Sequence, residues 1–207
     1  MPTWTFETLA KADRKTLEEV LLAAQAPDPA QLDGCVYNGY NHDGLAHLAV
    51  EKFRKAFYRQ DHLLYGYNQM VIQDRRHYAG EWRVRMKQGK PVLQGFYRVT
   101  FARDEPARKY SAPYKHLAFF NYNIDLNPRW NVGMRSIRDY VGLPNAGDHS
   151  LLLGKAYLQL APGLAVFASY FVLGHPEVLK ESWNDKAAYS TVPHGISMGN
   201  RILSISM

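Results

Sequence analysis

A histidine and several tyrosines at alternating positions are the residues of this sequence best suited to chemistry. Residues 114–124 have the composition of a β-strand, and one of its faces would carry Tyr114, His116, Ala118, Phe120 and Tyr122. An imidazole titrates near neutral pH, so His116 could act as a general base or as a polar contact for a ligand. Tyr97, on another predicted strand, could move protons together with it. A hydrogen-bonded core histidine is the alternative interpretation.

Three short clusters combine tyrosine with asparagine and form a second group of interest. They are Gly39-Tyr40-Asn41, Gly66-Tyr67-Asn68 and Asn121-Tyr122-Asn123. Tyrosine offers an apolar ring with a polar tip, and asparagine both donates and accepts hydrogen bonds. Such groups at strand ends could line the mouth of a pocket, or they could simply mark turns above packed rings.

Several familiar kinds of site are missing from the sequence. It has no Gly-x-Ser-x-Gly nucleophile turn and no glycine-rich phosphate loop. Its single cysteine, Cys35, excludes an intramolecular disulfide and any multi-cysteine zinc site, and the eight histidines show no metal-binding spacing. We therefore expect neither a metal nor a cofactor.

The positive charge is concentrated in one part of the chain. The whole sequence has a formal charge of +6, whereas residues 52–103 hold twelve basic and three acidic side chains, or +9. Such a segment attracts anions, or it keeps the outer face of a sheet soluble. No nucleic-acid-binding motif accompanies it, which argues against nucleic acid as a partner.

We recognise no targeting signal in the sequence. The N-terminus lacks the features of a signal peptide, and the most apolar stretch, residues 151–173, is interrupted by glycine, lysine and proline. Together with the single cysteine, this predicts a cytoplasmic protein with no membrane partner.

The elements that must position these residues are mostly strands. A capped amphipathic helix is expected over residues 13–26, a strand over 35–41, and a short helix or a strand over 51–59. Residues 82–86 and 92–101 alternate around a turn at 87–91, which predicts a hairpin with Trp82, Val84, Met86, Leu93, Tyr97, Val99 and Phe101 on its buried face. A short helix over 131–141 and a last hairpin, 150–160 with 165–173, complete the pattern.

Successive hairpins without crossover helices predict a mainly β fold (α+β by content). An antiparallel barrel, closed or nearly closed, is the economical arrangement because closure removes sheet edges. An α+β cone, with N-terminal helices packed into a curved sheet, is the competing arrangement.

The order of features resembles that of the lipocalin-like (calycin) β-barrels, and more narrowly the GXWXG-type lipocalin-like proteins. The segments that carry the resemblance are Gly34-Cys35-Val36-Tyr37-Asn38-Gly39, Ile137-Arg138-Asp139-Tyr140, Asp148-His149-Ser150-Leu151-Leu152-Leu153-Gly154-Lys155 and Tyr170-Phe171-Val172-Leu173. The first lacks the tryptophan of that pattern, and residues 127–174 carry most of the likeness. The resemblance implies an internal pocket for a small, mostly apolar ligand.

We therefore expect a single lipocalin-like barrel domain over residues 1–174, followed by a C-terminal extension over 175–207 with a helix and an irregular tail. The leading function is a small-molecule carrier or sensor for a hydrophobic ligand that can be anionic. Its expected ligand-binding residues are Trp82, Met86, Tyr97, His116, Phe120, Tyr122, Tyr170, Tyr40 and Tyr67.

Two other functions remain open at this stage. One is a cofactor-independent isomerase or cyclase in the same pocket, with His116 and Tyr97 as catalytic residues. The other is a module that binds nucleic acid or a protein partner through the basic segment. A homodimer is compatible with all three.

Overall fold

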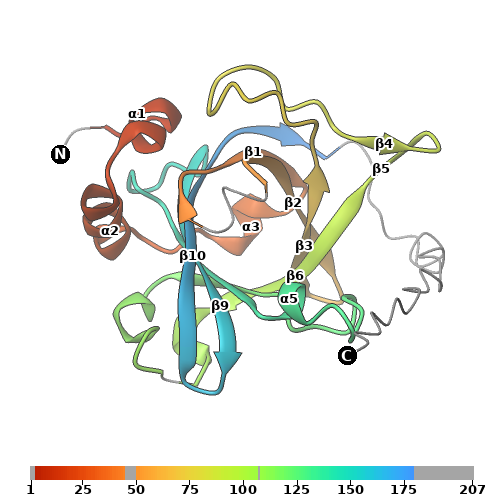
Figure 1. Ribbon diagram of the computed structural model, residues 1–207. Helices are drawn as coiled ribbons and strands as arrows, with labels where there is room; N and C mark the ends of the chain where they lie inside the picture. Colours follow the sequence, from red (N-terminus) through yellow and green to blue (C-terminus); the bar gives the residue numbers. More distant parts are fainter. Residues whose placement is uncertain (1–2, 45–49, 107, 180–207) are drawn as a thin grey trace, which may run out of the picture.

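Eight antiparallel strands close into a barrel, as expected from the sequence (Figure 1). The computed structural model describes residues 3–44, 50–106 and 108–179. Neighbouring strands follow the order β1-β10-β9-β8-β7-β6-β3-β2. Their bounds are β1 (Cys35–Asn41), β2 (Lys52–Gln60), β3 (Leu63–Met70), β6 (Leu93–Phe101), β7 (Ala118–Asn121), β8 (Ile137–Gly142), β9 (Leu151–Ala161) and β10 (Leu164–Val178).

Two helices cover the outside of the barrel beside β9 and β10. They are α1 (Phe6–Lys11) and α2 (Arg14–Ala23), which contact β10 and β9 respectively (Figure 1). The Asp13 side chain caps α2 by accepting a hydrogen bond from the Thr16 amide. The capped helix that begins after residue 13 is therefore confirmed, although it ends at Ala23.

One end of the barrel is closed by a short helix, α3 (Pro29–Leu32). It lies within the outline of the barrel in Figure 1, and it leads directly into the start of β1. Leu32 is fully buried there and packs with Leu143 and Leu152. Next to it, the Tyr37 hydroxyl donates a hydrogen bond to the carbonyl of His149 at 2.8 Å. Within the described residues, α3 and the Tyr37 side chain thus cover this end of the barrel.

Aromatic rings fill the middle of the barrel. Phe57 lies edge-on to Tyr37, Tyr97 and Phe120, and the last two stack with their centroids 5.1 Å apart. The Tyr97 ring crosses β3 at Gly66, where any side chain would overlap it. Its hydroxyl donates to the carbonyl of Ala56 at 3.0 Å. Gly66 is thus required by the close approach of this ring.

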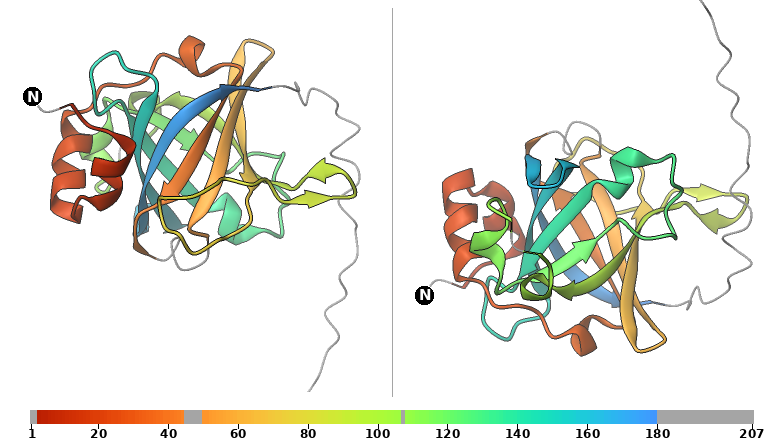
Figure 2. Two further views of the ribbon diagram at one scale, coloured as in Figure 1. Left: turned by 90° about the horizontal axis from the view of Figure 1, so that it is seen from above. Right: turned by 90° about the horizontal axis from the view of Figure 1, so that it is seen from below.

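The predicted hairpin of residues 82–86 and 92–101 is right only around its turn: Met86 and Lys87 pair with Pro91 and Lys90, but residues 93–101 pair with β3 and β7. Residues 71–92 instead form a strap on the outside of the barrel, ending in the small hairpin β4 (Met86–Lys87) and β5 (Lys90–Pro91). That hairpin projects on the side away from α1 and α2 (Figure 2). Met86 is exposed, and Trp82 is half-buried on the outer surface.

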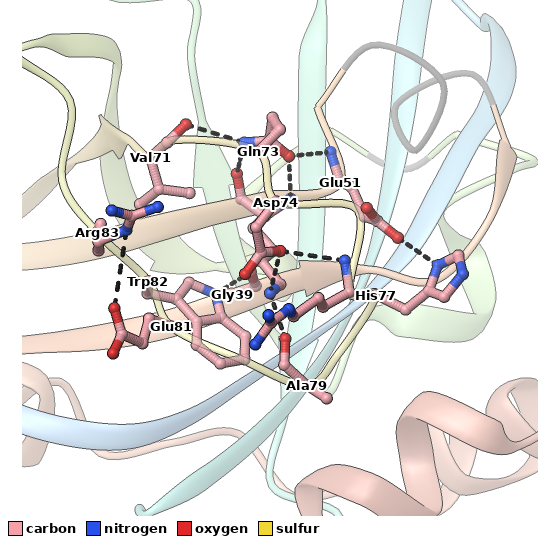
Figure 3. Close-up of polar contacts among 12 residues, drawn as sticks. Gly39, Glu51, Val71, Gln73, Asp74, His77, Ala79, Glu81, Trp82 and Arg83 are labelled. Atoms are coloured by element: carbon pink, nitrogen blue, oxygen red, sulfur yellow. Dashed lines mark hydrogen bonds and ion pairs between the residues drawn. The ribbon is translucent and has the colours of Figure 1, made fainter.

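The strap is held to the barrel by the contacts drawn in Figure 3. The Trp82 indole donates to the carbonyl of Gly39 at 2.8 Å, and the Gln73 amide exchanges hydrogen bonds with the backbone of Lys52. The fully buried Lys52 ammonium binds Asp74 at 2.7 Å, donates to the Ala79 carbonyl and lies over the Trp82 ring. Trp82 is therefore an anchor of the strap.

A bulge in β6 explains why strand alternation failed there. Gly95 has a φ of +60°, and the pairing of β6 with β3 shifts between Gly66 and Asn68. The extra residue turns Leu93 outward and Gln94 toward the interior, while Tyr97 and Val99 keep facing inward. The predicted inward position is therefore right for Tyr97 and Val99 and wrong for Leu93.

The remaining elements refine the expected ones. The segment expected as a short helix or a strand over 51–59 is the strand β2, which begins at Lys52. β7 begins only at Ala118, and the short 3₁₀ helices η1 (Ala102–Asp104) and η2 (Ala112–Tyr114) precede it. The helix expected over 131–141 is a single turn, α5 (Val132–Arg135), followed by β8. The last hairpin is confirmed.

The expected C-terminal extension begins inside a strand, because β10 continues to Val178. The helix and tail expected after that point lie outside the described residues. Among the helices of the described segments, none has both the length and the apolar character needed to cross a membrane.

Candidate ligand-binding cavity

A cavity of about 350 Å³ lies inside the barrel, at the end opposite α3. Most of its apolar lining comes from α5, β8, β9 and β10, where Met134, Ile137 and Leu158 are partly exposed. The complete lining is Asn41, Val50, Phe53, Lys55, Asn68, Gln94, Tyr122, Gly133, Met134, Ile137, Asp139, Ala156, Leu158, Ala168, Ser169 and Phe171. Its size is that of a site for a small organic molecule.

Three polar side chains form the floor of this cavity. Lys55 from β2, Tyr122 just after β7 and Asp139 from β8 are each buried to about 2% exposure. The Lys55 Nζ donates to the Tyr122 hydroxyl at 2.5 Å and lies 3.3 Å from Asp139 Oδ2. The Tyr122 hydroxyl donates to the same Oδ2 at 3.1 Å. An amine, a phenol and a carboxyl group thus share hydrogen bonds at one point of the cavity.

Burial controls the ionisation of these groups. Loss of water lowers the pKa of Lys55, an effect that Asp139 only partly opposes. The same desolvation raises the pKa of Asp139 despite the nearby ammonium group, and it raises the pKa of Tyr122 well above 10.0. The charged forms of both members of the Lys55–Asp139 pair are therefore less favoured than they are in water.

Five aromatic rings surround the Lys55 amino group. The centroid of Tyr97 is nearest, at 4.4 Å, and the others lie between 5.2 and 5.6 Å. They belong to Phe53, Phe120, Tyr122 and Phe171. The faces of aromatic rings stabilise a cation, so the protein offers partial compensation to any positive charge at this nitrogen.

The wall of the cavity adds a few polar groups. Asn68 donates to the Tyr122 hydroxyl at 3.4 Å, and its buried Oδ1 has no hydrogen-bond partner within the described residues. Near the open end, Ser169 donates to Asn41, which in turn donates to the carbonyl of Val50. Asn68 is therefore able to bind a polar atom of a ligand.

The sequence-predicted site residues divide into two groups. Tyr122 lines the cavity, while Tyr97 and Phe120 pack directly beneath its floor. Trp82, Met86, Tyr40, Tyr67 and Tyr170 do not line it. Trp82 and Met86 belong to the strap, Tyr40 and Tyr170 lie in the outer core beside the helices, and Tyr67 lies in a separate outer cluster with Tyr58.

His116 does not point into the barrel. It is exposed in the turn between η2 and β7, because the strand expected from residue 114 starts four residues later. The inward face predicted for this segment is right for Ala118, Phe120 and Tyr122 and wrong for Tyr114 and His116. The predicted roles of His116 as a ligand contact and as a catalytic base are therefore not supported.

Tyr170 takes part in a second polar cluster, on the outer side of the barrel wall. Its hydroxyl and that of Tyr114 donate to Glu18 of α2, and Lys155 binds Glu18 at 2.8 Å. Burial opposes ionisation of Glu18, but the hydrogen bonds from Lys155, Tyr114 and Tyr170 lower the pKa of this carboxyl group overall. This cluster fastens α2 to the barrel.

Sequence reasoning missed Lys55 and Asp139. In β2, Phe53, Lys55 and Phe57 share the inner face, so a lysine stands between two core positions. Asp139 stands likewise between Ile137 and Val141. A charged residue at the centre of an apolar alternation was the available signal, but it becomes visible only once both segments are known to be strands.

No protein-family model matches the chain, and a comparison with curated proteins finds no significant match. The closed eight-stranded antiparallel barrel is compatible with a lipocalin-like fold. Within the described residues, no group of three or more His, Cys, Asp and Glu side chains is arranged to hold a metal ion.

Proposed function

We propose that the protein is a lipocalin-like carrier or sensor that binds one small, mostly apolar molecule in the barrel cavity. The observation that carries this proposal is the buried Lys55 amino group at the floor of a largely apolar cavity. An ion pair in a protein interior gains little stability over well-packed apolar side chains. A lysine kept in such a place, next to an open cavity, is more readily understood as a contact for a ligand.

The chemistry of the floor defines the polar end of the ligand. Asp139 already balances the charge of Lys55, so a carboxylate would add an uncompensated negative charge to a desolvated site. A neutral acceptor, such as a carbonyl or hydroxyl oxygen, can take a hydrogen bond from the Lys55 ammonium group, which has a hydrogen left beyond those given to Tyr122 and Asp139, at no such cost. We therefore favour a neutral polar group over the anionic one expected from the sequence.

The alternative function as an isomerase or cyclase loses the residues first assigned to it. His116 is exposed, and the Tyr97 hydroxyl donates to the Ala56 carbonyl beneath the cavity floor. Acid–base chemistry in this barrel would have to use Lys55, Tyr122 and Asp139.

The proposal is tested by displacement of the neutral dye Nile red with four compounds of one skeleton: naphthalene, 2-naphthalenemethanol, 2-naphthaldehyde and 2-naphthoate. We expect the alcohol and the aldehyde to bind about tenfold more tightly than naphthalene, the effect of one added hydrogen bond. The naphthoate should bind more weakly than the alcohol.

Two variants locate the binding. Ala156→Leu fills the cavity from β9 and should weaken binding of every compound, whereas Lys55→Met combined with Asp139→Asn should remove only the advantage of the polar compounds. Unchanged binding in the Ala156→Leu variant would show that the compounds bind elsewhere, and the proposal would fail.

A further inference from the structure

The Lys55 amino group has the surroundings of a reactive amine rather than of an ordinary structural lysine. It is the only lysine among the described residues that line the cavity. Its side chain is 2% exposed, and its nitrogen has the Tyr122 hydroxyl and the Asp139 carboxyl group as hydrogen-bond partners. A molecule in the cavity would therefore meet this amine together with two groups that can transfer protons.

The local electrostatics favour the neutral form of the amine. Burial lowers the pKa of Lys55 and raises that of Asp139, so both shifts favour moving a proton from the ammonium group to the carboxylate. Only a neutral amine has the lone pair needed to attack a carbonyl carbon, and desolvation in an apolar pocket is a common way to activate a lysine. The geometry brings the donor and the acceptor of that proton within 3.3 Å.

We propose that Lys55 forms a reversible imine with an apolar aldehyde or ketone bound in the cavity. This inference rests on the proposed binding function and names its ligand class. The neutral polar end favoured above then becomes a carbonyl group whose carbon faces the Lys55 nitrogen and whose oxygen faces Tyr122.

The reaction is a condensation with no change of oxidation state. Asp139 begins this sequence with the proton received from the Lys55 ammonium group. The nitrogen lone pair forms the C–N bond, and the carbonyl π electrons move to oxygen, which takes a proton from Tyr122 as Tyr122 is reprotonated by Asp139. The Asp139 carboxylate then takes a proton from nitrogen and gives it to the new hydroxyl group, and the C–O bond breaks as the nitrogen lone pair forms the C=N bond. One amine and one carbonyl compound thus give one imine and one water molecule.

The product also fits the site. A protonated imine keeps a positive charge at the position of the Lys55 nitrogen, where five aromatic rings and the Asp139 carboxylate can stabilise it. Burial penalises the strongly hydrated ammonium ion more than it penalises a less strongly hydrated imine cation, so the rings and Asp139 compensate the product's charge more fully.

Lys155 has similar aromatic surroundings but lies outside the cavity. Four rings lie within 5.8 Å of its nitrogen, and its partner is Glu18. However, Lys155 lies on the outer side of the barrel wall and does not line the cavity. It therefore provides a matched internal control.

The test is reductive trapping at neutral pH with 2-naphthaldehyde and sodium cyanoborohydride, followed by intact-mass measurement and peptide mapping. We expect one early adduct, with the mass of the aldehyde less one oxygen atom, at Lys55. Because an exposed lysine is almost fully protonated at this pH, labelling of Lys55 should be at least about tenfold faster than that of Lys15.

Variants and a non-reactive probe separate the two proposals. Lys55→Met combined with Asp139→Asn removes the amine without leaving a buried unpaired carboxylate, and it should abolish the early adduct. Lys155→Met should retain it. 2-Naphthalenemethanol cannot form an imine, and its displacement of Nile red reports binding alone. If this alcohol binds but Lys55 is labelled no faster than Lys15, the imine is refuted and the binding function stands. If the alcohol does not bind, both proposals fail.

Discussion

Replacing Lys55 with methionine should make the stability of the protein depend on pH in a characteristic way. The substitution keeps a long apolar side chain but leaves Asp139 buried without its cation. Burial already raises the pKa of Asp139 in the intact pair, and removal of the ammonium group also removes the attraction that lowers it. In the variant, the pKa of Asp139 should therefore rise further, and we expect its carboxyl group to be protonated in the folded state.

The ordinary pKa of an aspartate side chain, 3.8, sets the pH above which Asp139 loses its proton in the unfolded variant. The native state then binds a proton that the unfolded state has lost, so stability falls as the pH rises above that value. Each pH unit above 3.8 lowers the free energy of unfolding of the variant by about 1.4 kcal/mol. This loss grows by about 2.7 kcal/mol between pH 5 and pH 7 and reaches at most about 4.4 kcal/mol at pH 7.

The measurement is urea unfolding of Lys55→Met at pH 5, 6 and 7, followed by tryptophan fluorescence. The matched control is Lys55→Met with Asp139→Asn, which differs only in that residue 139 no longer titrates. The free-energy difference between the two variants should change by about 1.4 kcal/mol for each pH unit. A difference that stays constant from pH 5 to pH 7 would refute the reasoning about the buried pair.

Three other predictions test the scaffold around the cavity. Gly66→Ala should lower the free energy of unfolding by about 1–3 kcal/mol, because the new methyl group overlaps the Tyr97 ring; urea unfolding measures this, and an unchanged midpoint would contradict the packing. Trp82→Phe should cost about 1 kcal/mol by removing the indole hydrogen bond, and it should speed proteolysis within residues 71–92; equal cleavage rates would show that the indole does not hold the strap. Glu18 stabilises the fold as a carboxylate with a lowered pKa, so its contribution is present above its usual pKa of 4.5 and lost as the pH falls below it. The melting temperature of Glu18→Gln should accordingly change less between pH 6 and pH 3 than that of the unmodified protein. The same pH dependence in both proteins would contradict a stabilising role of the Glu18 carboxylate.

Local patterns were sufficient to predict much of the barrel. The strand of residues 35–41 and the last hairpin follow from β-forming residues and from the turn at residues 161–163, and Asp13 marks the start of α2. Closure of the sheet followed from consecutive hairpins without crossovers. Such features depend on neighbours in the sequence, which is why they can be recognised there.

The cavity could not be predicted in the same way because it depends on register. The bulge at Gly95 reverses the side to which Leu93 and Gln94 point, and the glycine within the alternating run is its only sign in the sequence. Lys55 and Asp139 are 84 positions apart and meet only when the barrel closes. Their charges would place both residues on the surface in any analysis of single segments.

The closure of the barrel by α3 has a kinetic consequence for ligand exchange. Because α3 covers one end of the barrel, we expect a ligand to enter and leave by the other end, so an occupant must leave before its successor enters. The rate of replacement should therefore equal the dissociation rate of the first ligand and should not rise with the concentration of the competitor. Water released at Lys55 would have to leave by that same opening, past the bound apolar chain.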